Sequence, residues 1–408
     1  MRRKTKQLLL RLIPIIVIFI AIVSGFVINY FMRIPSEWNT GTPLGEYETS
    51  TVGFDVNTQN NLVYISSGNS CLIIDADDPT NPSLLAEYDK ESPAKAIDYQ
   101  DELLAISGIR DVNFVDVSDP SSPTNLSVVE VHINYTVADV VLKGDFALVA
   151  VHPNPYAEPD LNYRVLYAFN ITDPENPIEV DVKRRYGFQS YSMNVHQDIA
   201  YIINPTSGIV LYNVTDPTNI IQLGFLNGFG LVPTLPYAVN AMESGISQTS
   251  TATYIIIADY DNGYIVADVS NPTNPLPGSG IIMGNCISID VTYDYAYILQ
   301  RNGTVSVFSM EDPSLLKIAG RFDAYDEEHN ARDIHVHQAT NKMYVLHNHG
   351  LSILQLSEGE INEYYRQEAK SRTLTIAIIV SFVITAPLAA VVIMRHRDPN
   401  AYTSRIGR

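Results

Sequence analysis

Short apolar runs recur along this chain, and most of them stop at a turn built on proline. The clearest example places Phe114–Val117 before Ser118, Asp119 and Pro120, with a second apolar run at Leu126–Val129. Proline fixes its own φ and biases the preceding residue towards extended geometry, while Ser and Asp side chains hydrogen-bond nearby backbone. The pattern therefore predicts two strands joined by a tight turn.

The same pattern returns along most of the chain. The turn prolines lie 41 to 55 residues apart, at Pro79, Pro120, Pro174, Pro217, Pro272 and Pro313. In a seventh copy, after residues 351–357, Gly359 takes the place of the proline. A repeat of roughly 40–45 residues with four short strands is typical of a propeller blade. We therefore predict an all-β fold, a seven-bladed β-propeller spanning residues 42–357.

One repeat shows how a blade divides into strands. Residues 287–292, 295–300, 305–309 and 315–322 are predicted as its four strands, counted from the centre outward. The last repeat lacks an outer strand, but residues 43–49 resemble the outer strand predicted at residues 83–89. We expect residues 43–49 to complete the last blade and close the ring, because closure removes open sheet edges.

Two long apolar segments flank the repeats. Residues 8–31 and 374–394 are each long enough to cross a bilayer as a helix, and basic residues follow the second span. With basic tails at 1–7 and 395–408, the positive-inside rule places both termini in the cytoplasm. Residues 358–372 form a polar, helix-prone linker at the membrane. The sequence thus predicts a cell-membrane protein with an extracellular propeller and two flanking transmembrane helices.

Charge and cysteine content exclude several classes of protein. The formal net charge is −19, and the basic residues crowd both ends, so the repeats are more acidic than the total suggests. Such a surface repels phosphate backbones, and we expect no nucleic-acid partner. The two cysteines, Cys71 and Cys286, lie in different repeats and cannot form a disulfide framework.

The repeated motif also resembles a known family. The motif reads aliphatic-x-Val-Asp-Val-Ser-Asp-Pro-x-x-Pro and is carried most clearly by residues 114–123. It is preceded by a Gly and by Ala-Tyr-Ile segments such as Ala200–Ile202 and Ala296–Ile298. This motif resembles the LVIVD-repeat family over about residues 42–357. The resemblance implies a propeller of the kind found on bacterial and archaeal cell surfaces, and it implies no particular activity.

Candidate chemistry is sparse. Four histidines, His335, His337, His347 and His349, fall in one predicted hairpin. Residues two apart share a strand face, so each pair could present two imidazoles to a transition metal. The alternative interpretation is that these are polar residues around a turn, with no cofactor.

N-glycosylation motifs support an extracellular repeat region. They occur at Asn125, Asn134, Asn170, Asn213 and Asn302. Asn170 and Asn213 also lie inside the prolyl-turn motif, where asparagine is favoured for its own turn geometry.

The function predicted from sequence is a non-enzymatic binding or interaction module at the cell surface. Its partners would be a surface protein, a glycan or another cell-envelope component. Two alternatives stay open at this point. One is a metal-dependent binding protein or enzyme with its site in the central funnel of the propeller. The other is a transmembrane sensor that acts through a cytoplasmic partner.

Overall fold

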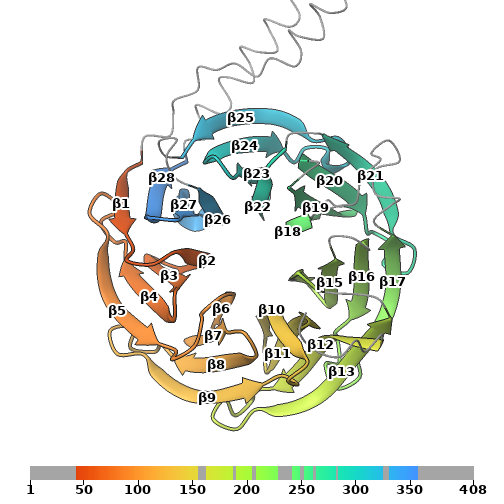
Figure 1. Ribbon diagram of the computed structural model, residues 1–408. Helices are drawn as coiled ribbons and strands as arrows, with labels where there is room; N and C mark the ends of the chain where they lie inside the picture. The colour runs from red at the N-terminus through yellow and green to blue at the C-terminus, as the bar shows by residue number, and fades with distance from the viewer. Residues whose placement is uncertain are drawn as a thin grey trace, which may run out of the picture. The chain divides into compact units, whose positions relative to one another are not determined.

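The computed structural model describes residues 43–154, 162–186, 190–204, 208–227, 241–248, 252–260, 263–281, 284–324 and 330–356. These residues form seven four-stranded antiparallel sheets, arranged as blades around a central channel (Figure 1). Helix in this part of the chain is limited to two short 3₁₀ turns, Pro313–Leu315 and Gln338–Thr340. The predicted all-β, seven-bladed propeller is confirmed.

In every blade the strands follow one another from the channel to the rim. The first blade contains β2 (Gly53–Gln59), β3 (Leu62–Ser67), β4 (Ser70–Asp75) and β5 (Ser83–Asp89). The second contains β6 (Ile97–Gln100), β7 (Leu103–Ser107), β8 (Asp111–Asp116) and β9 (Thr124–Glu130). The third contains β10 (Tyr135–Lys143), β11 (Phe146–Pro153), β12 (Asn162–Asn170) and β13 (Ile178–Tyr186). The fourth contains β14 (Ser192–His196), β15 (Ile199–Asn204), β16 (Gly208–Asn213) and β17 (Ile221–Asn227).

The remaining blades repeat this plan. The fifth contains β18 (Ala241–Gln248), β19 (Thr253–Asp259), β20 (Gly263–Asp268) and β21 (Leu276–Ile281). The sixth contains β22 (Cys286–Val291), β23 (Tyr295–Gln300), β24 (Thr304–Ser309) and β25 (Lys317–Asp323). The seventh contains β26 (Ala331–His337), β27 (Lys342–His347), β28 (Gly350–Gln355) and, from the start of the domain, β1 (Gly45–Glu48).

Strand β1 closes the ring. It pairs with β28 in antiparallel register, with Gly45 opposite Ile353 and Glu48 opposite Gly350. This is the position that the sequence predicts for residues 43–49. The first and last described segments therefore share one sheet, and both reach it from the same face of the propeller.

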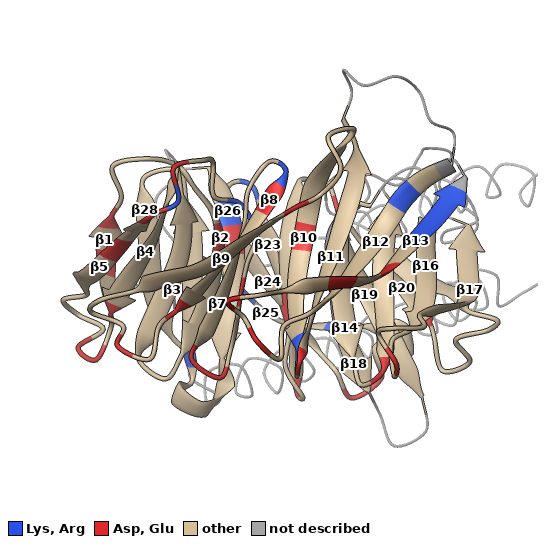
Figure 2. Ribbon diagram, turned by 90° about the horizontal axis from the view of Figure 1, so that it is seen from below, with Lys and Arg blue, Asp and Glu red and all other residues tan. Residues whose placement is uncertain are grey.

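The two faces of the propeller differ in the connections that they carry. The prolyl-turn face, as we name it, carries the turns from each third strand to the outer strand and the hairpins between first and second strands. The link face carries the hairpins between second and third strands and the links between blades. Acidic side chains gather at the turns of the prolyl-turn face, at the bottom of Figure 2.

The apolar core lies between neighbouring blades and not at one centre. A cluster at the seam of the ring joins Val63, Ile65 and Ile74 of the first blade to Leu346 and Ile353 of the last. Each other pair of neighbouring blades holds a similar cluster. Because each sheet is covered on both faces, its middle strands are apolar nearly throughout.

The aspartates of the repeat motif shape the prolyl turns. The Asp78 carboxylate accepts hydrogen bonds from the Thr80 hydroxyl (2.7 Å) and backbone N–H (3.0 Å). These bonds hold the pKa of Asp78 below its usual value. Asp119, Asp216 and Asp312 accept from the residue two positions on in the same way. Their recurrence in successive blades therefore reflects turn geometry, as the sequence pattern predicts.

The prolyl turns at Pro79, Pro174 and Pro272 also contact the outer strand of the preceding blade. The Ser127 hydroxyl of β9 donates to the Pro174 carbonyl at 2.6 Å. Where the outer strand carries glycine instead, as at Gly45 and Gly224, a Cβ atom would collide with the carbonyl oxygen of Pro79 or Pro272. The repeated motif thus joins neighbouring blades at the rim, and this contact requires a small residue on the outer strand.

The sixth blade shows one departure from the expected boundaries. The outer strand begins at Lys317 and not at Leu315, because residues 313–315 form a 3₁₀ turn. Asp312 caps this turn by accepting a hydrogen bond from the Ser314 backbone N–H.

Several predicted segments lie outside the described residues. These are the spans at 8–31 and 374–394, the tails at 1–7 and 395–408, and the linker at 358–372. Within the described part of the chain, no helix is long and apolar enough to span a bilayer.

Candidate functional site: the central channel

The innermost strand of five blades contains a β-bulge near the link face. In β2 the ladder shifts between Gly53 and Asp55, and β26 shifts in the same way between Ala331 and Asp333. Corresponding shifts occur in β10, β18 and β22. In the fourth blade the backbone N–H of the link residue Tyr191 donates to the Ile203 carbonyl, and Ile203 is also the register partner of Ser192, which gives the same two-to-one pairing. In the second blade Ser107 bonds to both Lys95 and Ala96, two residues of the link before β6. Bulges re-aim side chains, and they are frequent beside functional sites.

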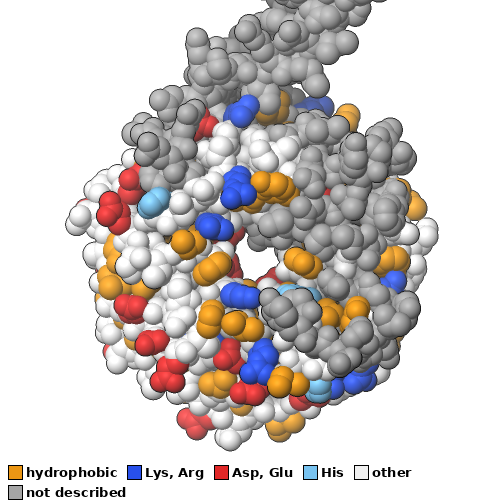
Figure 3. Space-filling model, in the orientation of Figure 1, with side chains coloured by type: hydrophobic (Ala, Val, Ile, Leu, Met, Phe, Trp, Pro, Cys, Tyr) orange, Lys and Arg blue, Asp and Glu red, His pale blue; other side chains and the backbone are white. Residues whose placement is uncertain are grey.

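The bulged residues form a ring that we call the collar. Its described side chains are Phe54, Lys95, Ala138, Tyr191, Ile287 and Arg332. Phe54, in β2, is 47% exposed, and Tyr191, directly before β14, is 50% exposed, although both strands are the innermost of their blades. Among the described side chains, apolar and basic ones border the channel opening on the link face (Figure 3). The collar therefore offers aromatic and cationic groups at the mouth of the channel.

Beneath the collar lies a second ring, the acidic belt, which consists of Asp55, Asp98, Asp139, Asp290 and Asp333. Each carboxylate accepts a backbone N–H from the inner strand of the next blade. The N–H donors are Ile97 to Asp55 (2.7 Å), Leu142 to Asp98 (2.7 Å), Met193 to Asp139 (2.8 Å), Val336 to Asp290 (2.7 Å) and Val56 to Asp333 (2.9 Å). Inner strands are sheet edges with unpaired N–H groups, so the belt satisfies donors that would otherwise be orphaned.

Burial and crowding perturb three of these acids, Asp55, Asp98 and Asp139. Burial raises the pKa of Asp98 to about 6 and that of Asp139 to about 7, even though each accepts two backbone hydrogen bonds. The pKa of Asp55 lies well above its usual value because of burial and because the neighbouring Asp333 carboxyl group repels its charge. Desolvation and like charges both disfavour the ionised form. Parts of the belt are therefore protonated near neutral pH.

We expect the propeller to be more stable at about pH 5 than at about pH 7.5. The pKa values of Asp98 and Asp139, about 6 and about 7 in the folded protein, lie above the roughly 3.9 of an unfolded chain. The folded state binds protons more tightly, so this stabilisation is complete below the unfolded value and is lost as the pH rises through 6 and 7. Urea unfolding at both pH values should show a difference on the order of 2 kcal/mol.

Asp139→Asn supplies the check on this pH dependence. The variant should reduce the difference between the two pH values, because one of the titrating groups is lost. The pKa of turn aspartates such as Asp78 is lowered, so their protonation destabilises the fold only as the pH falls below about 4. They do not change stability between about pH 5 and about pH 7.5. Equal stability of the wild-type protein at both pH values would contradict the prediction.

The four predicted metal-binding histidines do not meet at one point. His335 and His337 lie on β26, and the His335 Nδ1 is 3.7 Å from an Asp290 carboxylate oxygen. His347 lies at the other end of the hairpin, because its register partner is Ala331. Its ring faces the Ser352 hydroxyl at 3.3 Å, and its Nδ1 accepts from the His349 backbone N–H.

The described residues contain no group of three or more His, Cys, Asp or Glu side chains arranged to hold a metal ion. Binding of a transition metal by either histidine pair stays a prediction. Residues 327–329, just upstream of the hairpin, lie outside the described residues.

The glycosylation motifs lie at varied positions. Asn125 and Asn302 are exposed, while Asn134 is half-buried in the link before β10. Asn170 and Asn213 accept hydrogen bonds from the backbone N–H groups of Thr172 and Thr215, and so act as turn residues. The carboxamide oxygen of Asn125 accepts from the Tyr88 hydroxyl at 2.9 Å.

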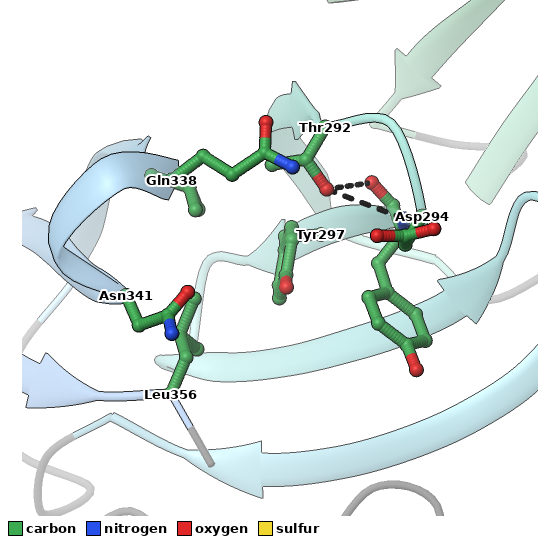
Figure 4. A pocket seen from close by; sticks show the side chains of 8 residues that line it. Thr292, Asp294, Tyr297, Gln338, Asn341 and Leu356 are labelled. Atoms are coloured by element: carbon green, nitrogen blue, oxygen red, sulfur yellow. Dashed lines mark hydrogen bonds between the residues drawn. The ribbon is translucent and has the colours of Figure 1, made fainter. Parts of the chain in front are cut away.

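A second concave site lies on the prolyl-turn face between the sixth and seventh blades. Figure 4 shows Tyr297 between Thr292, Gln338 and Asn341. Thr292 bonds to the backbone of Tyr295 in both directions, which closes the hairpin above the pocket. Apart from two tyrosines, Asp294 is the only ionisable residue in the lining of this pocket. The lining therefore lacks a nucleophile paired with a base.

Sequence reasoning missed both channel rings. The sequence does contain a signal, since Asp followed by Val or Ile recurs in the inner strands at 55–56, 139–140, 290–291 and 333–334. These residues read as ordinary alternation within a strand. Only the closed ring shows that each carboxylate reaches the neighbouring blade.

Comparison with known proteins agrees with this architecture. Residues 54–90, 111–130 and 252–277 match the family described as the LVIVD repeat. The chain carries LVIVD repeats. The matched stretches cover most of the first blade, the outer half of the second and most of the last three strands of the fifth.

A solved structure is similar to this LVIVD-repeat propeller in its overall fold. The crystal structure of the computationally designed Ika8 protein is 9% identical, with a TM-score of 0.52. The match covers 78% of this chain and 100% of that one. At this identity it shows the fold alone. No curated protein sequence matches the chain.

Proposed function

We propose that this LVIVD-repeat propeller is a membrane-anchored, non-enzymatic binding module that is displayed outside the cell and meets its partner with the link face. The observation that carries the proposal is the collar. The exposed aromatic side chains of Phe54 and Tyr191 share the collar with the basic side chains of Lys95 and Arg332. Aromatic residues and arginine dominate the binding energy of many protein interfaces.

The acidic belt supports binding in preference to catalysis. Its carboxylates are occupied by backbone N–H groups of neighbouring blades, which fixes them as parts of the framework. A catalytic acid or base has to present its oxygen to a substrate. The contact between the Asp55 and Asp333 carboxyl groups favours the alternative, an acid–base or cation site in the funnel, but both groups also hold the ring together.

Topology supports the proposed orientation. The described chain enters at β1 and leaves after β28, and the pairing of Gly45 with Ile353 puts both ends on the prolyl-turn face. If residues 8–31 and 374–394 are the anchors, the prolyl-turn face is turned to the membrane and the link face is free. The exposed Asn125 and Asn302 fit an extracellular location.

Capture of components from the protein's own cell envelope tests the proposal. The full-length protein in neutral detergent should retain envelope material, and Phe54→Ala with Tyr191→Ala should reduce capture by at least about tenfold because it removes two exposed aromatic anchors. Tyr293→Ala is the matched control, since Tyr293 is 81% exposed in a hairpin of the prolyl-turn face. Absence of capture, or an equal loss in the Tyr293 variant, would refute the proposed binding face.

A further inference from the structure

The collar contains two cations that the protein itself does not neutralise. Within the described residues, neither the Lys95 ammonium nor the Arg332 guanidinium forms a hydrogen bond or a salt bridge. Lys90, by contrast, pairs with Asp111 at 2.6 Å. In a chain of net charge −19, carboxylates to pair with are plentiful. Two unpaired cations on the same ring, with one blade between them, therefore point to an anionic ligand from outside.

Lys95 is also partly removed from water. Its side chain is half-buried, and burial lowers its pKa. Its positive charge also contributes to lowering the pKa of His152, which places the two groups close together. A desolvated cation without a partner is unfavourable in the free protein, and an arriving carboxylate relieves that cost.

Flat aromatic surfaces accompany the cations. The Tyr191 ring stacks on His152 with centroids 5.5 Å apart and planes 17° from parallel, yet Tyr191 remains 50% exposed. Phe54, from the blade between those of Arg332 and Lys95, is 47% exposed. The electron-rich face of an aromatic ring attracts the partly positive C–H groups of a sugar ring laid against it.

The channel wall does not suit an extended peptide. A peptide that adds to a sheet needs a free row of backbone N–H and C=O groups. Along the inner strands, the N–H groups of Val56, Ile97, Leu142 and Met193 already donate to the acidic belt. The collar thus offers side-chain faces and charges but few free backbone donors.

We infer that the collar binds an anionic glycan, a chain of sugar rings that bear carboxylates. Lys95 and Arg332 bind the carboxylates, and Phe54 and Tyr191 stack on the sugar rings. The acidic belt beneath repels the negative charges, so the glycan lies across the mouth and does not enter the channel. This inference rests on the proposed binding function and names its ligand class.

Binding of uronic-acid oligosaccharides to the full-length protein tests the inference. The probes are oligogalacturonate, oligoglucuronate and oligomannuronate, titrated by calorimetry in neutral detergent. We expect at least one to bind, and its methyl ester, with the same rings but no charge, to bind at least about tenfold more weakly. Raising the salt concentration should weaken binding of the acid form.

Variants locate the site. Lys95→Gln with Arg332→Gln should weaken binding of the uronide at least about tenfold, and Tyr191→Ala should do the same. Lys317→Gln removes an exposed charge from the outer strand of the sixth blade and should bind as the wild type does. Similar losses in the Lys317 variant, or equal affinity for the methyl ester, would overturn the inference.

Two further outcomes separate this inference from the proposed function. If the protein captures its envelope but binds none of the three uronides, or binds polyglutamate as tightly, the glycan inference is wrong and the binding function stands. If it captures nothing and binds no uronide, both fail.

Discussion

Gly45→Val should open the ring and lower the free energy of unfolding by about 3 kcal/mol or more. A Cβ atom at Gly45 would collide with the carbonyl oxygen of Pro79 and lie within 3.0 Å of the Thr80 backbone. Backbone atoms cannot move aside as a flexible side chain can, so either β1 leaves β28 or the first prolyl turn is displaced. Both outcomes uncover the apolar cluster that joins the first and last blades.

Chemical denaturation of the full-length protein measures the loss. Glu46→Val introduces the same residue one position along the same strand, at an exposed site, and should change stability by less than about 0.5 kcal/mol. A Gly45→Val protein as stable as the wild type would show that the rim contact at the seam is not tightly packed.

Asp333→Ala should destabilise the propeller by about 2–4 kcal/mol. Asp333 is only 6% exposed, and its carboxylate accepts from the Ser288 hydroxyl at 2.7 Å and from the Val56 backbone N–H at 2.9 Å. Alanine leaves both buried donors without their acceptor, and a buried unsatisfied donor retains its full desolvation cost. These hydrogen bonds join three blades, since Ser288 lies in the sixth, Asp333 in the seventh and Val56 in the first. The lost stability therefore concerns the seam at which the ring closes.

Asp119→Ala is the comparison for this substitution. The Asp119 carboxylate accepts two hydrogen bonds, both from Ser121, but it is exposed in a prolyl turn, so its removal should cost about 1 kcal/mol. Asp333→Asn keeps one acceptor oxygen and removes the charge beside Asp55. The pKa of Asp55, followed by carboxyl NMR, should therefore fall. An unchanged Asp55 pKa would contradict the proposed contact between the two carboxyl groups.

The blade plan could be predicted from sequence because its signals are local. The motif at 114–123 combines an apolar strand, two Asp-led turns and a proline within a few residues, and Asp116 and Asp119 indeed accept bonds from residues two positions on. The closing strand was recognisable because residues 43–49 copy another outer strand. Repetition supplied the long-range information that a single motif lacks.

The channel could not be predicted because its contacts cross blades. Asp55 bonds to the backbone of Ile97, 42 residues away, and Asp333 bonds to Val56, 277 residues away. The bulges that expose Phe54 and Arg332 cannot be recognised from the residue types, because a bulge depends on how the first strand pairs with the second. The histidine hairpin shows the same limit, because the β26–β27 register, which places His347 opposite Ala331 and His335 opposite Tyr344, could not be derived from the sequence.

The sharing of one sheet by β1 and β28 has a consequence for biosynthesis. During translation β1 leaves the ribosome first, and its partner emerges only after all the other blades have been made. Until then the nascent chain holds an unpaired edge and an uncovered apolar flank, the surfaces on which aggregation begins. A message truncated within the last repeat should therefore yield insoluble protein, even though six complete blades precede the break.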